Sequence, residues 1–424
     1  MSSTLLDRTA AAPIMPAPGG RSWDTVARLR LALGATVVAG LLLAGPALAG
    51  FALRAAAVDN ARAEATHLVT VQAGHTRLLT ADALAPRTIL TATPLETTLM
   101  NHYGYAVQEA TIRAAHEAGH AQDRDALASA AAGVQQYARE VERAQQLARD
   151  GDSRSPAVLQ AAQRELQREV LPRLDAVGVG SRARLAADLD RAGDARLVVV
   201  VALAVSVLVL ALVQVWLARR TRRVVNVGLV LATLATVAAG WFAVGVLADS
   251  AKAGDSAARR APVVEDLVAA RLGIFRAFAA EGVALLPHPR GTTAAEFEPA
   301  WRRDIDLARE ALGRVPSDVS SELVELLAVH TTAHDQIRTL LEQGDRAAAL
   351  QTATDPSDTG GAGSAENLDV TTSAALARSV YSLDDAFARA GDGLRLAGWS
   401  CLVAGIAVAV LGWWGIGRRL AEYR

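Results

Sequence analysis

A His-Glu-x-x-His run is the most chemically suggestive pattern in the sequence. It consists of His116, Glu117 and His120. On a helix this spacing places two imidazoles on one face as zinc ligands, with the glutamate positioned as the general base of a metallopeptidase. A catalytic zinc site also needs a third protein ligand and a cleft, and the sequence offers a candidate for neither. We therefore favour two exposed histidines at the end of a helix and keep a membrane-anchored zinc metallopeptidase as an alternative.

Other familiar chemistry is absent from the sequence. There is no glycine-rich phosphate loop, nucleophile elbow, paired-cysteine metal site or aspartate-rich calcium loop. His330 and His334 are four residues apart but have no acidic residue at ligand spacing, which favours a solvated helix face. The single cysteine, Cys401, excludes a disulfide framework, and a net charge of −1 gives no reason to expect nucleic acid as a partner. These observations predict a protein that is not an enzyme and needs no cofactor.

Four apolar stretches are long enough to cross a bilayer. They cover residues 31–53, 197–218, 224–247 and 396–417. Helix-favouring residues dominate the remaining sequence, so an all-α membrane protein is predicted. The spans contain no buried charge pair, which argues against ion transport. Ala47-Leu48-Ala49 resembles a signal-processing site, but the preceding apolar core is longer than that of a signal peptide, so we expect the first span to be retained.

Arginines near the span ends predict the orientation. Arg28 and Arg30 precede the first span, Arg219, Arg220, Arg222 and Arg223 join the second to the third, and Arg418, Arg419 and Arg424 follow the fourth. Four spans threaded in order put all three clusters on one side, which predicts cytoplasmic segments 1–30, 219–223 and 418–424 in a multi-pass cell-membrane protein. The long segments 54–196 and 248–395 are then extracytoplasmic. The link 219–223 is first a topology determinant, and it is also a candidate contact for a cytoplasmic partner.

The two halves of the chain repeat. Arg191-Ala192-Gly193-Asp194 returns as Arg389-Ala390-Gly391-Asp392, in each case just before a span. Trp216 and Trp414 match at the same offset of 198, and Ala57 and Ala253 are among several matches at an offset of 196. The predicted unit of span, outer segment and span therefore occurs twice.

Each outer segment is predicted to form an up-down four-helix bundle. In the first, helix-breaking residues predict helices ending near residue 85 before Pro86, from about 95 to 117, from about 123 to 149, and from Pro156 into the second span with a kink at Pro172. In the second, the breaks are predicted at Pro287-His288-Pro289, at Pro316 and in the glycine-rich tract 355–364.

The first helix of each bundle carries an apolar stripe with one polar position in common. The stripes are Leu68, Val71, His75, Leu78 and Asp82, and, 196 residues later, Val264, Leu267, Arg271, Ile274 and Phe278. Their 3,4 spacing keeps one side facing neighbouring helices. His75 and Arg271 are thus predicted to form a polar core layer, which either fixes helix register or responds to a ligand. The links at the far ends of the helices supply four charged candidates for docking a partner: Arg87, Asp152, Arg154 and Arg290.

This layout resembles the GlnX-like actinobacterial membrane sensors, which have four spans, two extracytoplasmic helical domains and short cytoplasmic segments. The resemblance covers nearly the whole chain but rests on layout, duplication and arginine content, so it implies no functional residues. It implies relay of a signal from an acidic-amino-acid-sensing, solute-binding lipoprotein of the GlnH type to a soluble Ser/Thr kinase of the protein kinase G type. Bundle sensors of this design often dimerise. An accessory subunit of an envelope or transport complex is the other alternative.

Overall fold

The computed structural model describes residues 25–91, 120–221, 227–286 and 296–422, and within them the regular structure is helical. Four helical stretches are long and apolar enough to cross a membrane: Arg30–Leu90, Ser155–Trp216, Val227–Ala284 and Gly361–Gly415. The predicted class, an all-α protein with four membrane-spanning helices, is confirmed.

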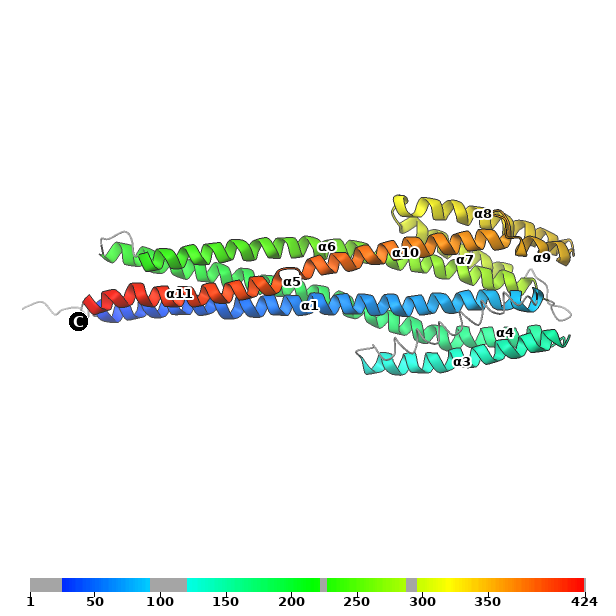
Figure 1. Cartoon of the computed structure of the whole chain (residues 1–424), viewed down its shortest axis with the longest axis horizontal. Coiled ribbons are helices and arrows are strands. Elements are labelled where there is room, and N and C mark those ends of the chain that lie inside the picture. The colour runs from blue at the N-terminus through cyan, green and yellow to red at the C-terminus, as the bar shows by residue number, and fades with distance from the viewer. Residues whose placement is uncertain (1–24, 92–119, 222–226, 287–295, 423–424) are drawn as a thin grey trace, which may run out of the picture. The chain divides into compact units, whose positions relative to one another are not determined.

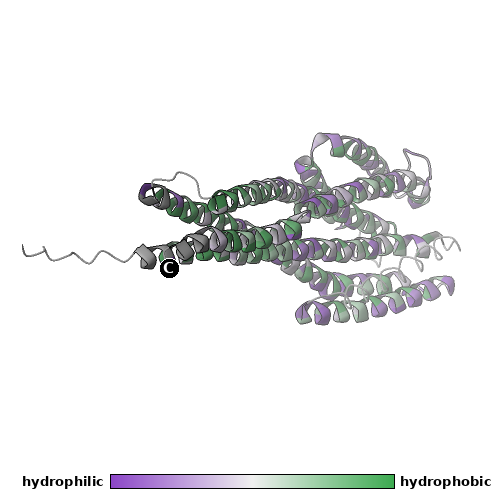
Figure 2. Ribbon diagram, turned by 60° about the vertical axis from the view of Figure 1, so that its left-hand side comes forward, coloured by the Kyte–Doolittle hydropathy of each residue, from purple (hydrophilic) through white to green (hydrophobic). Residues whose placement is uncertain are grey.

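The chain forms two compact units. The first, here called the apolar unit, comprises Met1–Gly50, Val198–Val244 and Leu396–Arg424, and the second, the polar unit, comprises Phe51–Leu197 and Gly245–Arg395. Helices α1 (Thr25–Thr91), α5 (Leu171–Thr221) and α6 (Val227–Ala284) each contribute to both units (Figure 1). Figure 2 shows hydrophobic residues along the helices of the apolar unit and interspersed hydrophilic residues along those of the polar unit.

Small residues bring helices together in the apolar unit. A Cβ atom added at Gly40 of α1 would lie 2.6 Å from the carbonyl oxygen of Gly405 in α11 (Leu394–Glu422). The reciprocal distance, from Gly405 to the Gly40 carbonyl, would be 2.5 Å. Close backbone approach through small residues is a common way for helices to associate in lipid, where burial of apolar side chains adds little. Large residues such as Leu41 point outward, as they should in a lipid solvent.

The polar unit contains the remaining helices. Its first segment adds α3 (Ala121–Arg149), α4 (Ser155–Glu165) and a π-helical turn (Leu166–Val170) that leads into α5. Its second segment adds α7 (Glu298–Arg314), α8 (Ser317–Glu342), α9 (Arg346–Thr354) and α10 (Gly361–Gly391). One hydrophobic core draws on both segments and includes Leu78, Leu166, Leu267 and Leu368.

Several helices begin or end at the helix-breaking residues from which their ends were predicted. Helix α3 ends at Arg149 before Gly151, whose φ of +71° favours glycine. Pro156 stands in the first turn of α4, and Pro316 separates α7 from α8. The predicted helix at 95–117 and the break at Pro287-His288-Pro289 lie outside the described residues.

Four features of the helices differ from expectation. Helix α1 continues through Pro86 to Thr91, because the Asp82 carbonyl, which loses its helical donor at the proline, accepts a hydrogen bond from the Gln163 side chain (3.5 Å). Near Pro172 the chain forms the π-helical turn. The glycine-rich tract is only partly a loop, because α10 already begins at Gly361. The short α9 was not predicted.

Candidate functional site

A buried arginine joins four helices of the polar unit. Arg54 of α1 donates from Nε to the Ser250 hydroxyl of α6 (3.0 Å) and from Nη1 to the Ala192 carbonyl of α5. Ser250 in turn donates to the Ala390 carbonyl of α10 (2.6 Å). Ser250 lies 196 residues after Arg54, and Ala390 lies 198 residues after Ala192. The bond from Arg54 to Ala192 and the bond from Ser250 to Ala390 therefore occupy corresponding positions of the predicted repeat. We call these four residues the Arg54 junction.

The two halves differ at this junction. Helix α5 passes through Ala192 without interruption, whereas α10 ends at Gly391, and Gly393 adopts a φ of +74° before α11 begins at Leu394. The Ala390 carbonyl lies at a helix end, where carbonyls lack intrahelical donors, and Ser250 supplies one. These hydrogen bonds therefore connect α1, α5, α6 and α10 to one another at a single point.

The expected polar layer places His75 and Arg271 beside matching partners. His75 is buried, with Nδ1 3.4 Å from Oδ1 of Asp175 on α5. Burial lowers the pKa of His75 to about 4, although the Asp175 charge opposes the shift. Arg271 forms an ion pair with Asp369 on α10. In each segment, the polar residue on the first helix thus contacts an aspartate on the last. A role in signalling stays a prediction.

A second buried polar contact lies on α1. The Tyr137 hydroxyl of α3 donates to Oδ1 of Asp82 (2.7 Å). Burial raises the pKa of Asp82 to about 6, while hydrogen bonds from Tyr137 and Gln163 act in the opposite direction. The carboxyl group therefore titrates near neutral pH inside the core.

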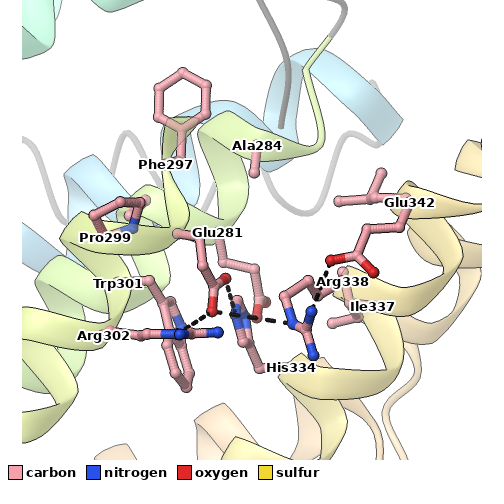
Figure 3. Close-up of a pocket in the computed structure, with 13 residues that line it drawn as sticks. Glu281, Ala284, Phe297, Pro299, Trp301, Arg302, His334, Ile337, Arg338 and Glu342 are labelled. Atoms are coloured by element: carbon pink, nitrogen blue, oxygen red, sulfur yellow. Dashed lines mark hydrogen bonds and ion pairs between the residues drawn. The ribbon is translucent and has the colours of Figure 1, made fainter. Parts of the chain in front are cut away.

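His334 lies at the centre of a buried cluster in the second segment. Its Nδ1 is 2.7 Å from Oε2 of Glu281 on α6, and its Nε2 is 3.1 Å from Oε2 of Glu298 on α7. Its ring stacks on Trp301 with centroids 3.6 Å apart and an interplanar angle of 6°. Arg302 donates to the other oxygen of Glu298 (2.6 Å). Figure 3 shows this arrangement.

The cluster favours the protonated form of its histidine. Burial alone would lower the pKa of His334, but hydrogen bonds and negative charge from Glu281 and Glu298 outweigh it and raise the pKa. Burial would raise the pKa values of the two glutamates, and the contacts with His334 lower them instead. The contacts therefore favour a protonated His334 between two ionised carboxylates.

The prediction of a solvated face for His330 and His334 was wrong. Both are buried, and His330 Nδ1 is 2.9 Å from the Ser364 hydroxyl. The partners come from helices 34 to 53 residues away, which local spacing could not reveal. One sequence signal could have found them, because both histidines continue a 3,4-spaced buried stripe on α8 consisting of Leu323, Leu327, His330, His334 and Ile337.

A cavity of about 500 Å³ lies beside this cluster, between α6, α7 and α8. Its lining includes Glu281, Glu298, Trp301, His334 and Arg338 of α8. Figure 3 labels Glu281, Trp301, His334 and Arg338 among them. Sequence reasoning singled out only His334 of this site and misjudged its burial, since the lining residues have no common motif.

Two of the three residues of the alternative zinc site lie outside the described residues. His116 and Glu117 lie outside them, and His120 is exposed with Nδ1 3.6 Å from Oε1 of Glu64. Within the described ranges no group of three or more His, Cys, Asp or Glu side chains could hold a metal ion.

The structure also locates some of the candidate contact residues. Asp152 and Arg154 form an ion pair (2.6 Å) in the link between α3 and α4. Arg87 lies half-buried on α1, and Arg290 is outside the described residues. Of the arginine link, Arg219 and Arg220 belong to the last turn of α5, whereas Arg222 and Arg223 are outside the described part. Whether these residues bind partners stays a prediction.

Comparison with known proteins gives one match. Residues 57–190 match the family model described as an actinobacterial sensor domain, which is about a third of the chain and covers most of the first segment of the polar unit. No curated protein and no solved structure matches the chain. The match and the four apolar helices together support a sensor-like actinobacterial membrane protein with a role in signal transduction, and they favour a non-enzymatic role.

Proposed function

We propose that this protein is a transmembrane relay that passes an extracytoplasmic signal to a separate cytoplasmic protein. One observation carries the proposal: the segment that matches a sensor domain begins and ends on α1 and α5, and both helices continue without a break into apolar stretches that can cross a membrane. In this proposal, each of these uninterrupted helices passes a displacement in the sensor segment on to its own apolar stretch.

The Arg54 junction is the coupling point of this relay. Packed helices shift by about 1–2 Å between discrete arrangements in known switches. Since Arg54 and Ser250 tie α1 to α5, α6 and α10, a shift of one helix has to be matched by the others or break buried hydrogen bonds. Leaving such groups unpaired costs about 1–3 kcal/mol each, which favours two discrete states over a continuum.

The partners follow from the resemblance in layout. The input is a solute-binding lipoprotein that recognises amino acids and docks on Arg87, Asp152, Arg154 and Arg290. The output is a soluble Ser/Thr kinase that contacts the arginine link, residues 219–223. Both termini are cytoplasmic in this scheme.

Photo-crosslinking in native membranes tests the partners. A photoreactive residue replaces Arg154, whose side chain is 75% exposed, and a matched control replaces Val179, which is 60% exposed on α5. We expect a solute-binding lipoprotein to be captured from position 154 and not from 179. Recovery of transport permeases or envelope enzymes alone would indicate an accessory subunit instead.

Phosphorylation tests the coupling. External acidic amino acids should change the phosphorylation of kinase substrates in cells with the wild-type protein, and Ser250→Ala should abolish the response while the protein still reaches the membrane. A response that persists in Ser250→Ala would show that the junction does not carry the signal.

A further inference from the structure

The cavity between α6, α7 and α8 contains hydrogen-bonding groups that the described part of the chain leaves unsatisfied. Glu281 is only 2% exposed, and its Oε1 accepts no hydrogen bond there. Trp301 is 4% exposed, and its indole N–H has no acceptor among the same residues. The Nε–H of Arg338 is also unmatched, with Oε1 of Glu298 at 4.0 Å. Buried polar groups in native folds are nearly always paired, so three exceptions that line one cavity point to a ligand.

The three unsatisfied groups require a ligand with two different ends. A carboxylate oxygen only accepts hydrogen bonds, whereas indole and guanidinium N–H groups only donate them. The ligand must therefore present a donor to Glu281 and an acceptor to Trp301 and Arg338. A simple cation or a simple anion satisfies one side of the cavity and leaves the other unpaired.

The charges of the lining residues balance when His334 is protonated, the form that its raised pKa favours. Three carboxylates and three basic groups surround the cavity: Glu281, Glu298 and Glu342 against Arg302, Arg338 and His334. Each carboxylate has at least one cationic neighbour, and Arg338 donates to Glu342 at 2.7 Å. A ligand without net charge keeps this balance, whereas a net-charged ligand would leave an uncompensated charge in a partly buried site.

We propose that this cavity binds a small zwitterion directly, through a protonated amine that donates to Glu281 and a carboxylate that accepts from Trp301 and Arg338. Hydrogen bonds between charged groups are about twice as strong as neutral ones, which favours a zwitterion over a neutral amide. A cavity of about 500 Å³ is of the size used for small molecules. Phe297, Pro299 and Ile337 provide an apolar wall for the carbon chain between the two ends. This binding does not require the relay.

Calorimetric titration of the full-length protein in lipid nanodiscs at pH 7 tests the proposal. Glycine, β-alanine and γ-aminobutyrate serve as a series in which the two charged ends lie progressively further apart. Ethylammonium chloride and sodium acetate supply each end alone. We expect saturable binding of at least one zwitterion with one site per chain, and binding at least about tenfold tighter than that of either half-ligand.

Two variants and a control locate the binding. Trp301→Phe keeps an aromatic ring beside His334 but removes the five-membered ring with its N–H, so affinity should fall about three- to tenfold. Glu281→Gln should weaken binding by at least about tenfold. The matched control is Glu322→Gln, an exposed carboxylate on α8 outside the cavity, which should stay within about twofold of wild type.

Each result of these measurements either supports or overturns the proposed zwitterion site. If Glu281→Gln does not fold, as judged by circular dichroism, Trp301→Phe and Arg338→Gln decide the question. Absence of saturable binding by all three zwitterions overturns the proposal. So does a half-ligand that binds as tightly as the best zwitterion, or a Trp301→Phe protein with wild-type affinity. Binding established here would stand even if no lipoprotein or kinase partner were found.

Discussion

Asp82 is a single buried residue that connects three helices. Its carboxylate accepts from Tyr137 of α3, and its backbone carbonyl, left without a helical donor by Pro86, accepts from Gln163 of α4. The same residue therefore compensates for a proline inside a helix and carries an ionisable group in the core. Because burial raises its pKa to about 6, its protonation state changes within the range in which bacteria live.

The pH dependence of stability should reveal this group. Asp82 has a folded-state pKa of about 6, above its ordinary value of 3.8, so the folded protein binds the proton more tightly than the unfolded chain does. Its stabilising contribution is complete below about pH 3.8 and is lost as pH rises through about 6, with an upper bound on the order of 3 kcal/mol. Asp82→Asn has no proton to lose, and its side-chain oxygen can still accept from Tyr137.

Thermal melting of wild type and Asp82→Asn between pH 4 and pH 7 is the measurement. The melting temperature of the wild type should fall relative to that of the variant as pH rises. Glu281 and Glu298, whose pKa values are lowered, contribute stability that is lost as pH falls, but both proteins contain them and their effect cancels in the difference. Parallel melting curves would show that Asp82 does not titrate in this range.

For individual residues, the sequence predicted burial but not the contact partner. The 3,4 spacing on α1 correctly indicated burial of Leu68, Val71, His75, Leu78 and Asp82. Burial of one face follows from local periodicity, whereas the identity of the partner follows from which helices meet. For that reason the ion pair of Arg271 with Asp369, and the contacts of His334 with two glutamates, could not be predicted.

At the scale of elements, α3 packs closely against the π-helical turn. A Cβ atom added at Gly133 of α3 would lie 2.5 Å from Cγ2 of Val170, a distance at which one of the two elements must move. Val170 is β-branched and stiff, so it cannot easily turn aside. The absence of a side chain at Gly133 is thus a condition for this packing.

Two glycine-to-alanine substitutions should have opposite effects on stability. Gly133→Ala gains up to about 1 kcal/mol of helix propensity but adds a clash worth about 1–3 kcal/mol, so the melting temperature should fall. Gly178→Ala on α5 meets its nearest atoms at 3.7 Å, an ordinary contact, and should raise it. Circular dichroism melting of both variants checks the signs. A stabilised Gly133→Ala would mean that the turn gives way without cost.

The end of a helix could be predicted where the backbone properties of a single residue determine it. Gly151 and Pro316 end or separate helices through their own backbone properties, and the sequence located both. Pro86 was misjudged because its effect depends on Gln163, which lies on another helix. Helix α9 was missed although local signals exist, since Gly344 has a φ of +80° and the Asp345 side chain caps the helix by accepting from the Ala348 amide.

At the scale of the whole molecule, the two halves of the sequence meet at positions that correspond in the predicted repeat. Arg54 and Ser250 bond to each other, and the carbonyls that they contact belong to the two copies of the Arg-Ala-Gly-Asp run. The polar unit also has a hydrophobic core to which both segments contribute. A repeat read from sequence indicates that two parts are alike but not whether they pack together. Their meeting through equivalent residues was therefore visible only in the structure.

The arginine clusters predict the orientation of the protein in the membrane. Alkaline phosphatase, which is active only outside the cytoplasm, should be active when fused after Asp150 or after Gly344 and inactive when fused after Arg424. The physical reason is that arginines flanking short loops are retained on the cytoplasmic side, and the three clusters agree with one another if the four spans thread in order. Activity only after Arg424 would invert the protein, place both long segments in the cytosol and remove the basis for an extracytoplasmic signal.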